Sequence, residues 1–351
     1  MRTDGWLMKT FRCTCQNALY FDNTACLHCG REVGFDAMSN GMVTLGAGTG
    51  FKRCANGQQF GVCNGAVREG RSVVCPACAL NRTIPDLTNP ANLPLWAGME
   101  AAKRRVLYTL AGLGFRPTSK LLDPGGVSFE FLAPWPGFHI STGHLDGIIT
   151  MNTLEADDTY RERQRRLLGE PYRTLVGHFR HEFGHYFWDH FFKWRSPHDP
   201  LLAEWRAHFG DERENYLEAL QRHYMNGPVA GCQQCFITAY ASLHPWEDWA
   251  ETWVQYLQMI DAVETAHAFG WSNEGAAAAL ELFPASEFAD DREFSEMFAF
   301  WSCLAPTINE IGVGWGHGYL YPFAFSPASR QKLHFVHRVA TACQRQQTLA
   351  A

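Results

Sequence analysis

Apolar residues recur at three- and four-residue steps over residues 171–193, a pattern that predicts an amphipathic helix. The apolar stripe of this helix consists of Leu175, Phe179, Phe183, Tyr186 and Phe187. Pro171 suits the first position of a helix, and no further proline occurs before residue 193. Patterns of the same kind predict further helices at 95–113, 157–168, 201–223, 245–269, 290–311 and 327–343.

Between the helices predicted at 95–113 and 157–168, short apolar runs bounded by glycine and proline predict a small sheet. Its strands are predicted at 127–132, 139–141 and 147–152. Residues 81–96 are rich in proline and asparagine, which is typical of a linker. We therefore expect an α+β chain with a separate N-terminal module at 1–80, a linker at 81–96 and a mainly helical domain with a small sheet at 97–351.

The most specific chemical signal is an H-E-x-x-H sequence, His181-Glu182-Phe183-Gly184-His185, within the helix of 171–193. On a helix this spacing puts two imidazoles one turn apart on one face, where they can bind one metal ion. Zinc suits imidazole nitrogens, and Glu182 lies close enough to take a proton from water activated by the metal. The alternative is two core histidines satisfied by carboxylates, and a third ligand downstream weighs against it.

Glu247 is the predicted third ligand, because Pro245 can open a helix that carries it. Catalytic zinc needs three protein ligands and one open position, and a carboxylate from a second helix completes the set. Glu251, one turn later, is predicted to accept a hydrogen bond from the outer nitrogen of a liganding histidine. His244 is a rival ligand, and two solvated acids at a helix start are the alternative for the glutamates.

Other zinc peptidase patterns fit less well. A metzincin would have a glycine and a third histidine where this chain has Trp188 and Phe191, so that class is excluded. Asp189, four residues after His185, is predicted either to support the site from behind the ligands or to face solvent.

Eight of the twelve cysteines precede Leu80 and form two groups of four, Cys13, Cys15, Cys26 and Cys29, and then Cys54, Cys63, Cys75 and Cys78. Paired cysteines at such spacings bring thiolates to tetrahedral distances and predict two structural zinc sites. Residues 1–80 are therefore predicted to be a zinc-ribbon module. Disulfides in a secreted protein are the alternative, disfavoured because the first residues show no apolar signal core, so we expect a cytoplasmic protein. Cys232 and Cys235 form a third pair. We interpret them as two incidental thiols, with a redox pair or a further metal site as the alternatives.

Composition and charge narrow the class of partner. Aromatic residues make up 14% and charged residues 19% of the chain, the balance of a folded globule, and no run of eighteen apolar residues predicts a membrane span. Residues 1–80 hold eight basic and five acidic side chains, and two zinc ions with four thiolates each bring the module to about minus one. This argues against a nucleic-acid partner and favours a protein partner for the ribbon.

Nearly the whole chain resembles the bacterial family of zinc-binding metallopeptidases that carry an N-terminal zinc ribbon. The resemblance rests on residues 13–15, 26–30, 82–87, 170–173, 177–188 and 239–253. The site is also similar to gluzincins such as thermolysin, and to the anthrax lethal factor catalytic domain, where a tyrosine lies seven residues before the ligand glutamate. Tyr240 has that place here, and the resemblance implies that its phenol hydrogen-bonds the oxyanion of the reaction. A packed core tyrosine is equally compatible.

These observations predict a zinc metallopeptidase with one catalytic and two structural zinc ions, in which Glu182 is the general base and a protein or peptide is the substrate. Gly147, Ile148, Ile149 and Thr150 are predicted to bind extended substrate as an added strand, with an ordinary sheet strand as the alternative. The main rival function is a zinc-stabilised adaptor whose H-E-x-x-H site is structural or silent. A more remote one is a ribbon-type nucleic-acid binder.

Overall fold

The computed structural model describes residues 10–135, 137–138, 140–168, 174–271, 288, 290–322 and 324–350, with only the backbone of 343–350. The segment 170–173, which includes the predicted helix start at Pro171, and His139 of the predicted strand 139–141 lie outside the described residues. The described part of the chain forms two compact units, one reaching Glu182 and the other beginning at Phe183.

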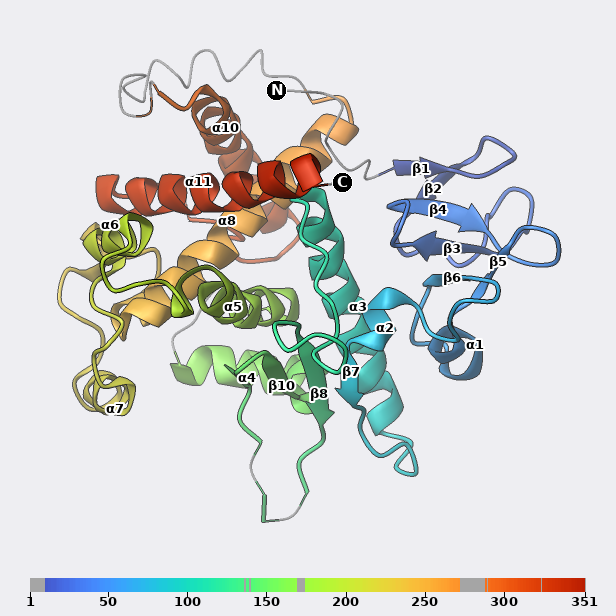
Figure 1. Ribbon diagram of the computed structural model, residues 1–351, viewed down its shortest axis with the longest axis horizontal. Helices are drawn as coiled ribbons and strands as arrows, with labels where there is room; N and C mark the ends of the chain where they lie inside the picture. The colour runs from blue at the N-terminus through green and yellow to red at the C-terminus, as the bar shows by residue number, and fades with distance from the viewer. Residues whose placement is uncertain are drawn as a thin grey trace. The chain divides into compact units, whose positions relative to one another are not determined.

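The cysteine-rich segment is built from three antiparallel two-stranded ladders, whose strands gather at one end of their unit (Figure 1). The ladders are β1 (Thr10–Arg12) with β2 (Ala18–Tyr20), β3 (Val33–Asp36) with β4 (Gly41–Thr44), and β5 (Phe51–Arg53) with β6 (Ala66–Arg68). Two short helices accompany them, α1 (Ala55–Phe60) and α2 (Pro76–Ala79). Phe11, Phe21 and Phe35 pack around Tyr108, which α3 (Asn92–Gly112) contributes to this small core.

A four-stranded sheet follows in the same unit, with the strand order β7-β8-β10-β9. Its strands are β7 (Asn81–Thr83), β8 (Ser128–Leu132), β9 (Gly143–Leu145) and β10 (Ile148–Asn152). The segment predicted as a linker thus supplies an outer strand. Phe129 and Phe131 are fully buried, and their rings lie 5.7 and 6.1 Å from that of Phe179 on α5 (Leu175–Trp188). The sheet therefore packs against the helix that carries the H-E-x-x-H sequence.

Strand β10 is an inner strand, which corrects the role predicted for Gly147, Ile148, Ile149 and Thr150. Residues 148–150 pair with β8 on one side and with β9 on the other, so this stretch has no open edge for a substrate strand. The cause is a tight hairpin at Asp146-Gly147, both with positive φ (48° and 75°), which folds β9 back onto β10. A Cβ at position 147 would lie 2.6 Å from the carbonyl oxygen of Gly126.

Helices make up most of the rest of the chain. After η1 (Thr153–Ala156) they are α4 (Asp158–Leu168), α5, the π-helical segment η2 (Asp189–Lys193), α6 (Pro200–Phe209), α7 (Tyr216–Asn226), the short turns η3 (Cys232–Gln234) and η4 (Tyr240–Ser242), α8 (Pro245–Ala268), α10 (Arg292–Gly314) and α11 (Pro327–Ala350). Helix α8 is flanked by α10 and α11 (Figure 1). No helix in the described part of the chain combines the length and apolar composition needed to cross a membrane.

The single helix predicted at 201–223 is wrong, because the segment forms two helices, α6 and α7. Gly210 ends α6 with φ at 106°, a backbone conformation that favours glycine. Asn215 then starts α7, accepting hydrogen bonds from the N–H groups of Leu217 and Glu218. The predicted fold class is confirmed: the protein is α+β, with a cysteine-rich N-terminal region, a small sheet and a mainly helical remainder.

Candidate functional site

Helix α5 carries both histidines of the H-E-x-x-H sequence. Thr174 caps its start, where the hydroxyl accepts a 2.9 Å hydrogen bond from the N–H of Gly177. The boundary between the two compact units passes through α5, but the helix itself is continuous. His181 and His185 therefore keep the one-turn spacing of neighbours on one helix face. Glu182 lies between them and is buried, with 7% of its surface exposed.

Helix α8 presents Glu247 in its first turn. Pro245 occupies the first helical position, and the ring of His244 accepts a 3.1 Å hydrogen bond from the N–H of Trp246. His244 is almost completely buried, and its other ring nitrogen lies 3.1 Å from the carbonyl oxygen of Glu214. Both ring nitrogens of this predicted rival ligand therefore contact backbone groups. Glu247 is itself 2% exposed.

Glycine at position 184 lets α5 and α8 approach closely. A Cβ there would lie 2.9 Å from the Cα of Ala250, closer than carbon atoms pack. The indole N–H of Trp249 donates a 2.9 Å hydrogen bond to the carbonyl oxygen of Gly184. The H-E-x-x-H pattern allows any residue at position 184, but the packing of α5 against α8 requires glycine there.

The predicted ligand atoms converge. Nε2 of His185 lies 3.6 Å from Oε2 of Glu247, and one side-chain ligand atom from each of His181, His185 and Glu247 lies within 4.8 Å of the others. Two imidazole nitrogens and one carboxylate oxygen are the donors that three-ligand catalytic zinc sites use. The chemistry and spacing of this set fit a zinc ion.

Three other predicted residues lie around these helices. Glu251 accepts a 2.8 Å hydrogen bond from Thr238, and Asp189 forms a 2.7 Å ion pair with Lys193. The ring of Tyr240 lies 6.0 Å from that of His223 on α7. The roles predicted for Glu251, Asp189 and Tyr240 in the reaction stay predictions.

Sequence reasoning missed two contacts of the site helices. The hydroxyl of Tyr216 donates a 2.9 Å hydrogen bond to Oε1 of Glu247, a residue thirty-one positions later in the sequence. His178, three residues before His181 on the same helix face, lies with Nδ1 3.4 Å from the buried carboxylate of Glu155. The spacing of His178 could have identified it, whereas nothing in the sequence links Tyr216 to Glu247.

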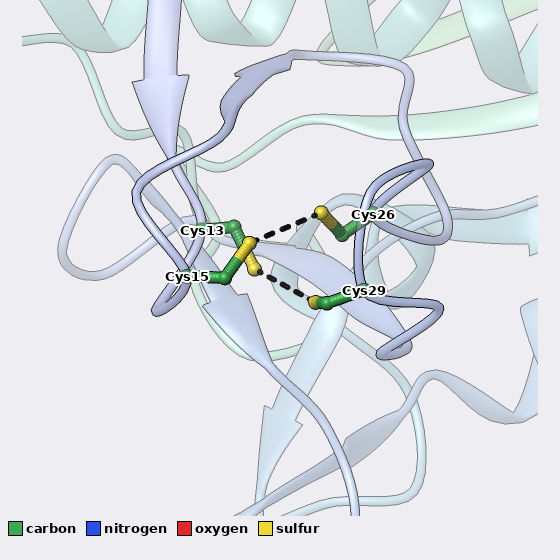
Figure 2. Close-up of side chains that lie close together, drawn as sticks. All are labelled: Cys13, Cys15, Cys26 and Cys29. Carbon is green, nitrogen blue, oxygen red and sulfur yellow. Dashed lines mark hydrogen bonds between the residues drawn. The ribbon is translucent and has the colours of Figure 1, made fainter.

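The first four cysteines face one another from two loops (Figure 2). The sulfur atoms of Cys13 and Cys29 lie 3.7 Å apart, as do those of Cys15 and Cys26. Tetrahedral zinc with Zn–S bonds of about 2.3 Å places sulfurs about 3.8 Å apart, whereas a disulfide needs about 2.05 Å. The backbone N–H of Cys29 lowers the pKa of Cys26 to about 6.

The second four cysteines are all buried and come together in the same way. The sulfurs of Cys63 and Cys75 lie 3.6 Å apart, and hydrogen bonds from Cys63, Cys75 and Cys78 hold the pKa of Cys54 far below its usual range. A Cβ on Gly65 would lie 2.6 Å from the sulfur of Cys75, so glycine is required there. Both predicted sets therefore have the geometry of four-cysteine zinc sites, and every cysteine whose side chain is described is a free thiol.

A buried ion pair lies next to Glu247 in sequence. Asp248 and Lys332 are 0% and 5% exposed, and their charged atoms lie 2.5 Å apart. Burial raises the pKa of Asp248 to about 7, against the lowering effect of the Lys332 ammonium. Lys332 also donates to the carbonyl oxygen of Cys235, so it joins α11 and α8 to the loop of the third cysteine pair.

Replacing Lys332 by methionine is expected to lower the free energy of unfolding by about 3–5 kcal/mol, because Asp248 would stay buried without its counter-charge. Urea unfolding measures this cost. Lys193→Met is a matched control, since it breaks the partly exposed pair with Asp189 and should cost less than about 1 kcal/mol. Equal costs for the two variants would contradict the prediction.

Cys232 and Cys235 are half-buried and exposed, respectively. Among the described residues, they take part in none of the clusters of three or more metal-binding side chains. Their interpretation as incidental thiols stays a prediction.

Comparison with known proteins agrees with both kinds of metal site, the cluster of His181, His185 and Glu247 and the two groups of four cysteines. A family model described as "Putative zinc-binding metallo-peptidase" matches residues 92–339, and one described as a zinc-ribbon domain matches residues 10–89. Uncharacterized proteins of Mycobacterium bovis and of two strains of Mycobacterium tuberculosis are 36% identical over 335 residues, which cover 95% of this chain and 95% of each relative. No solved structure matches the chain.

Proposed function

The chain belongs to this family of zinc-binding metallo-peptidases with an N-terminal zinc ribbon, and we propose that it hydrolyses peptide bonds at the centre formed by His181, His185 and Glu247. The observation that carries the proposal is the convergence of these three side chains. Glu182, buried and next to His181 in the sequence of the same helix, weighs against an adaptor with a silent site.

In the proposed reaction, His181, His185 and Glu247 would hold the metal. Zinc bound there would supply the Lewis acidity that acidifies water and polarises the scissile carbonyl. A carboxylate oxygen of Glu182 accepts the proton of the attacking water and returns it to the leaving amine. Burial of Glu182 limits its exchange of protons with bulk solvent, and Tyr240 is proposed to donate to the developing oxyanion.

Extended substrate is proposed to bind at β9 in place of the inner strand β10. Among the described strands, β9 is an outer member of the sheet that packs on α5, and Leu145 in it is 79% exposed. Backbone N–H and C=O groups along such an edge can pair with a peptide as a further strand. The protein partner predicted for the zinc ribbon stays a prediction.

The proposal is tested by incubating the zinc-loaded full-length chain with a peptide library and detecting products by mass spectrometry. We expect cleavage by the wild type and none by His181→Ala, which should lose about one of three zinc ions and keep the two bound by cysteines. This variant is more selective than a chelator, because a chelator would also remove the structural zinc. If wild-type protein with three zinc ions cleaves no peptide or protein, the adaptor function gains support.

A further inference from the structure

The two carboxylate oxygens of Glu247 have different neighbours. Oε2 lies 3.6 Å from Nε2 of His185, within the cluster that could bind a metal. Oε1 accepts a 2.9 Å hydrogen bond from the hydroxyl of Tyr216. The phenol therefore contacts the second oxygen of the carboxylate and not the one paired with His185.

Tyr216 is held in place by its surroundings. It is the first residue of α7, immediately after the capping residue Asn215, so the helix start fixes its backbone. Its ring lies 5.3 Å from that of His244 and 6.2 Å from that of Trp246, both at the start of α8. The same short stretch of α8 that presents Glu247 thus also packs against the ring of Tyr216.

A carboxylate that ligates a metal is oriented by the hydrogen bonds on its other oxygen, and losing such an outer contact typically weakens metal binding 10–100-fold. Glu247 is 2% exposed, so bulk water cannot easily replace a lost donor. A phenol is neutral and donates without adding charge, which leaves the negative charge of Glu247 available to the cation.

We propose that Tyr216 is a positioning residue of the metal centre, holding Oε1 of Glu247 so that Oε2 faces the imidazoles. The inference rests on the proposed function for the zinc centre of His181, His185 and Glu247. It does not depend on the reaction that follows metal binding.

The test is zinc titration of the full-length protein against a chromophoric chelator, comparing the wild type with Tyr216→Phe. Phenylalanine keeps the ring packing and removes only the hydroxyl. We expect the Kd of the third zinc ion to rise about 10–100-fold while the two cysteine sites are unchanged. Tyr224→Phe is the matched control, since Tyr224 lies on the same helix with 61% of its surface exposed, and its Kd should equal that of the wild type. Cobalt(II) bound at the third site should show a changed visible spectrum in Tyr216→Phe alone.

A third-site Kd unchanged in Tyr216→Phe would overturn the inference. So would an equal loss of affinity at all three sites with a lower Tm, because that pattern indicates a general structural role. A wild type that binds three zinc ions but cleaves nothing would end the proposed peptidase function, and the titration would still decide the role of Tyr216.

Discussion

Replacing Glu182 by glutamine is expected to abolish peptide hydrolysis while the protein keeps its full complement of zinc. Glutamine has nearly the same shape as glutamate, but its amide cannot accept the proton of the attacking water. General base catalysis of this kind contributes about 10²–10⁴-fold to turnover, so kcat should fall by at least that range. Since Glu182 is no member of the three-residue ligand cluster, metal content should not change.

The measurement is kcat on the best peptide of the library, together with zinc analysis of each variant. Glu162→Gln serves as the control, because this glutamate lies on α4 in surface ion pairs with Arg165 and Arg166. Its kcat should equal that of the wild type. Wild-type turnover in Glu182→Gln would remove the base from the proposed mechanism, and loss of the third zinc ion in that variant would indicate a metal-binding role.

The second large effect is expected from Cys75→Ser, which should unfold the cysteine-rich module locally. The buried cluster at this site consists of four cysteines and Val67, with Val74 and Ala77 packed against it, so metal bonds replace most of an apolar core. Structural zinc contributes about 10–16 kcal/mol in zinc-finger peptides, and a missing thiolate removes much of that free energy. Hydrogen exchange should show loss of protection in β5 and β6.

Zinc content in Cys75→Ser should fall from about three to about two ions per chain. Cys303→Ser, a change in the middle of α10, is the control and should affect neither zinc content nor the exchange of β5 and β6. A Cys75→Ser protein that keeps three zinc ions and full protection of those strands would contradict the role of Cys75 as a zinc ligand.

Local sequence signals predicted the two helices that carry the candidate site. The apolar stripe identified α5, whose start shifts to Leu175 in the structure, and Pro245 identified the start of α8. Cysteine spacing predicted both groups of four. These signals are local, because apolar residues repeat with the period of a helix and His181 and His185 lie one turn apart. The approach of Glu247 to the histidines depends in addition on how the helices pack.

Features set by single turns or by tertiary packing were harder to predict. The Asp146-Gly147 hairpin has a recognisable sequence, but the strand before it, Gly143–Leu145, lacks β-branched residues, so β9 was not predicted. Gly210 interrupts an otherwise helical pattern and splits α6 from α7. The contact between Tyr216 and Glu247 depends on how α7 packs against the start of α8, and no local pattern in the sequence predicts this packing.

The close approach of α5 and α8 at Gly184 limits which substitutions evolution can introduce at the metal centre. One added carbon at that position would push apart the backbones that bear the nitrogen and oxygen donors. Metal–donor distances vary by only about 0.2 Å in working sites, so even a small separation would disturb binding. Variation at residue 184 is therefore expected to require a shift of the helix backbone at Ala250, because the atom that an added Cβ would meet first is the Cα of that residue.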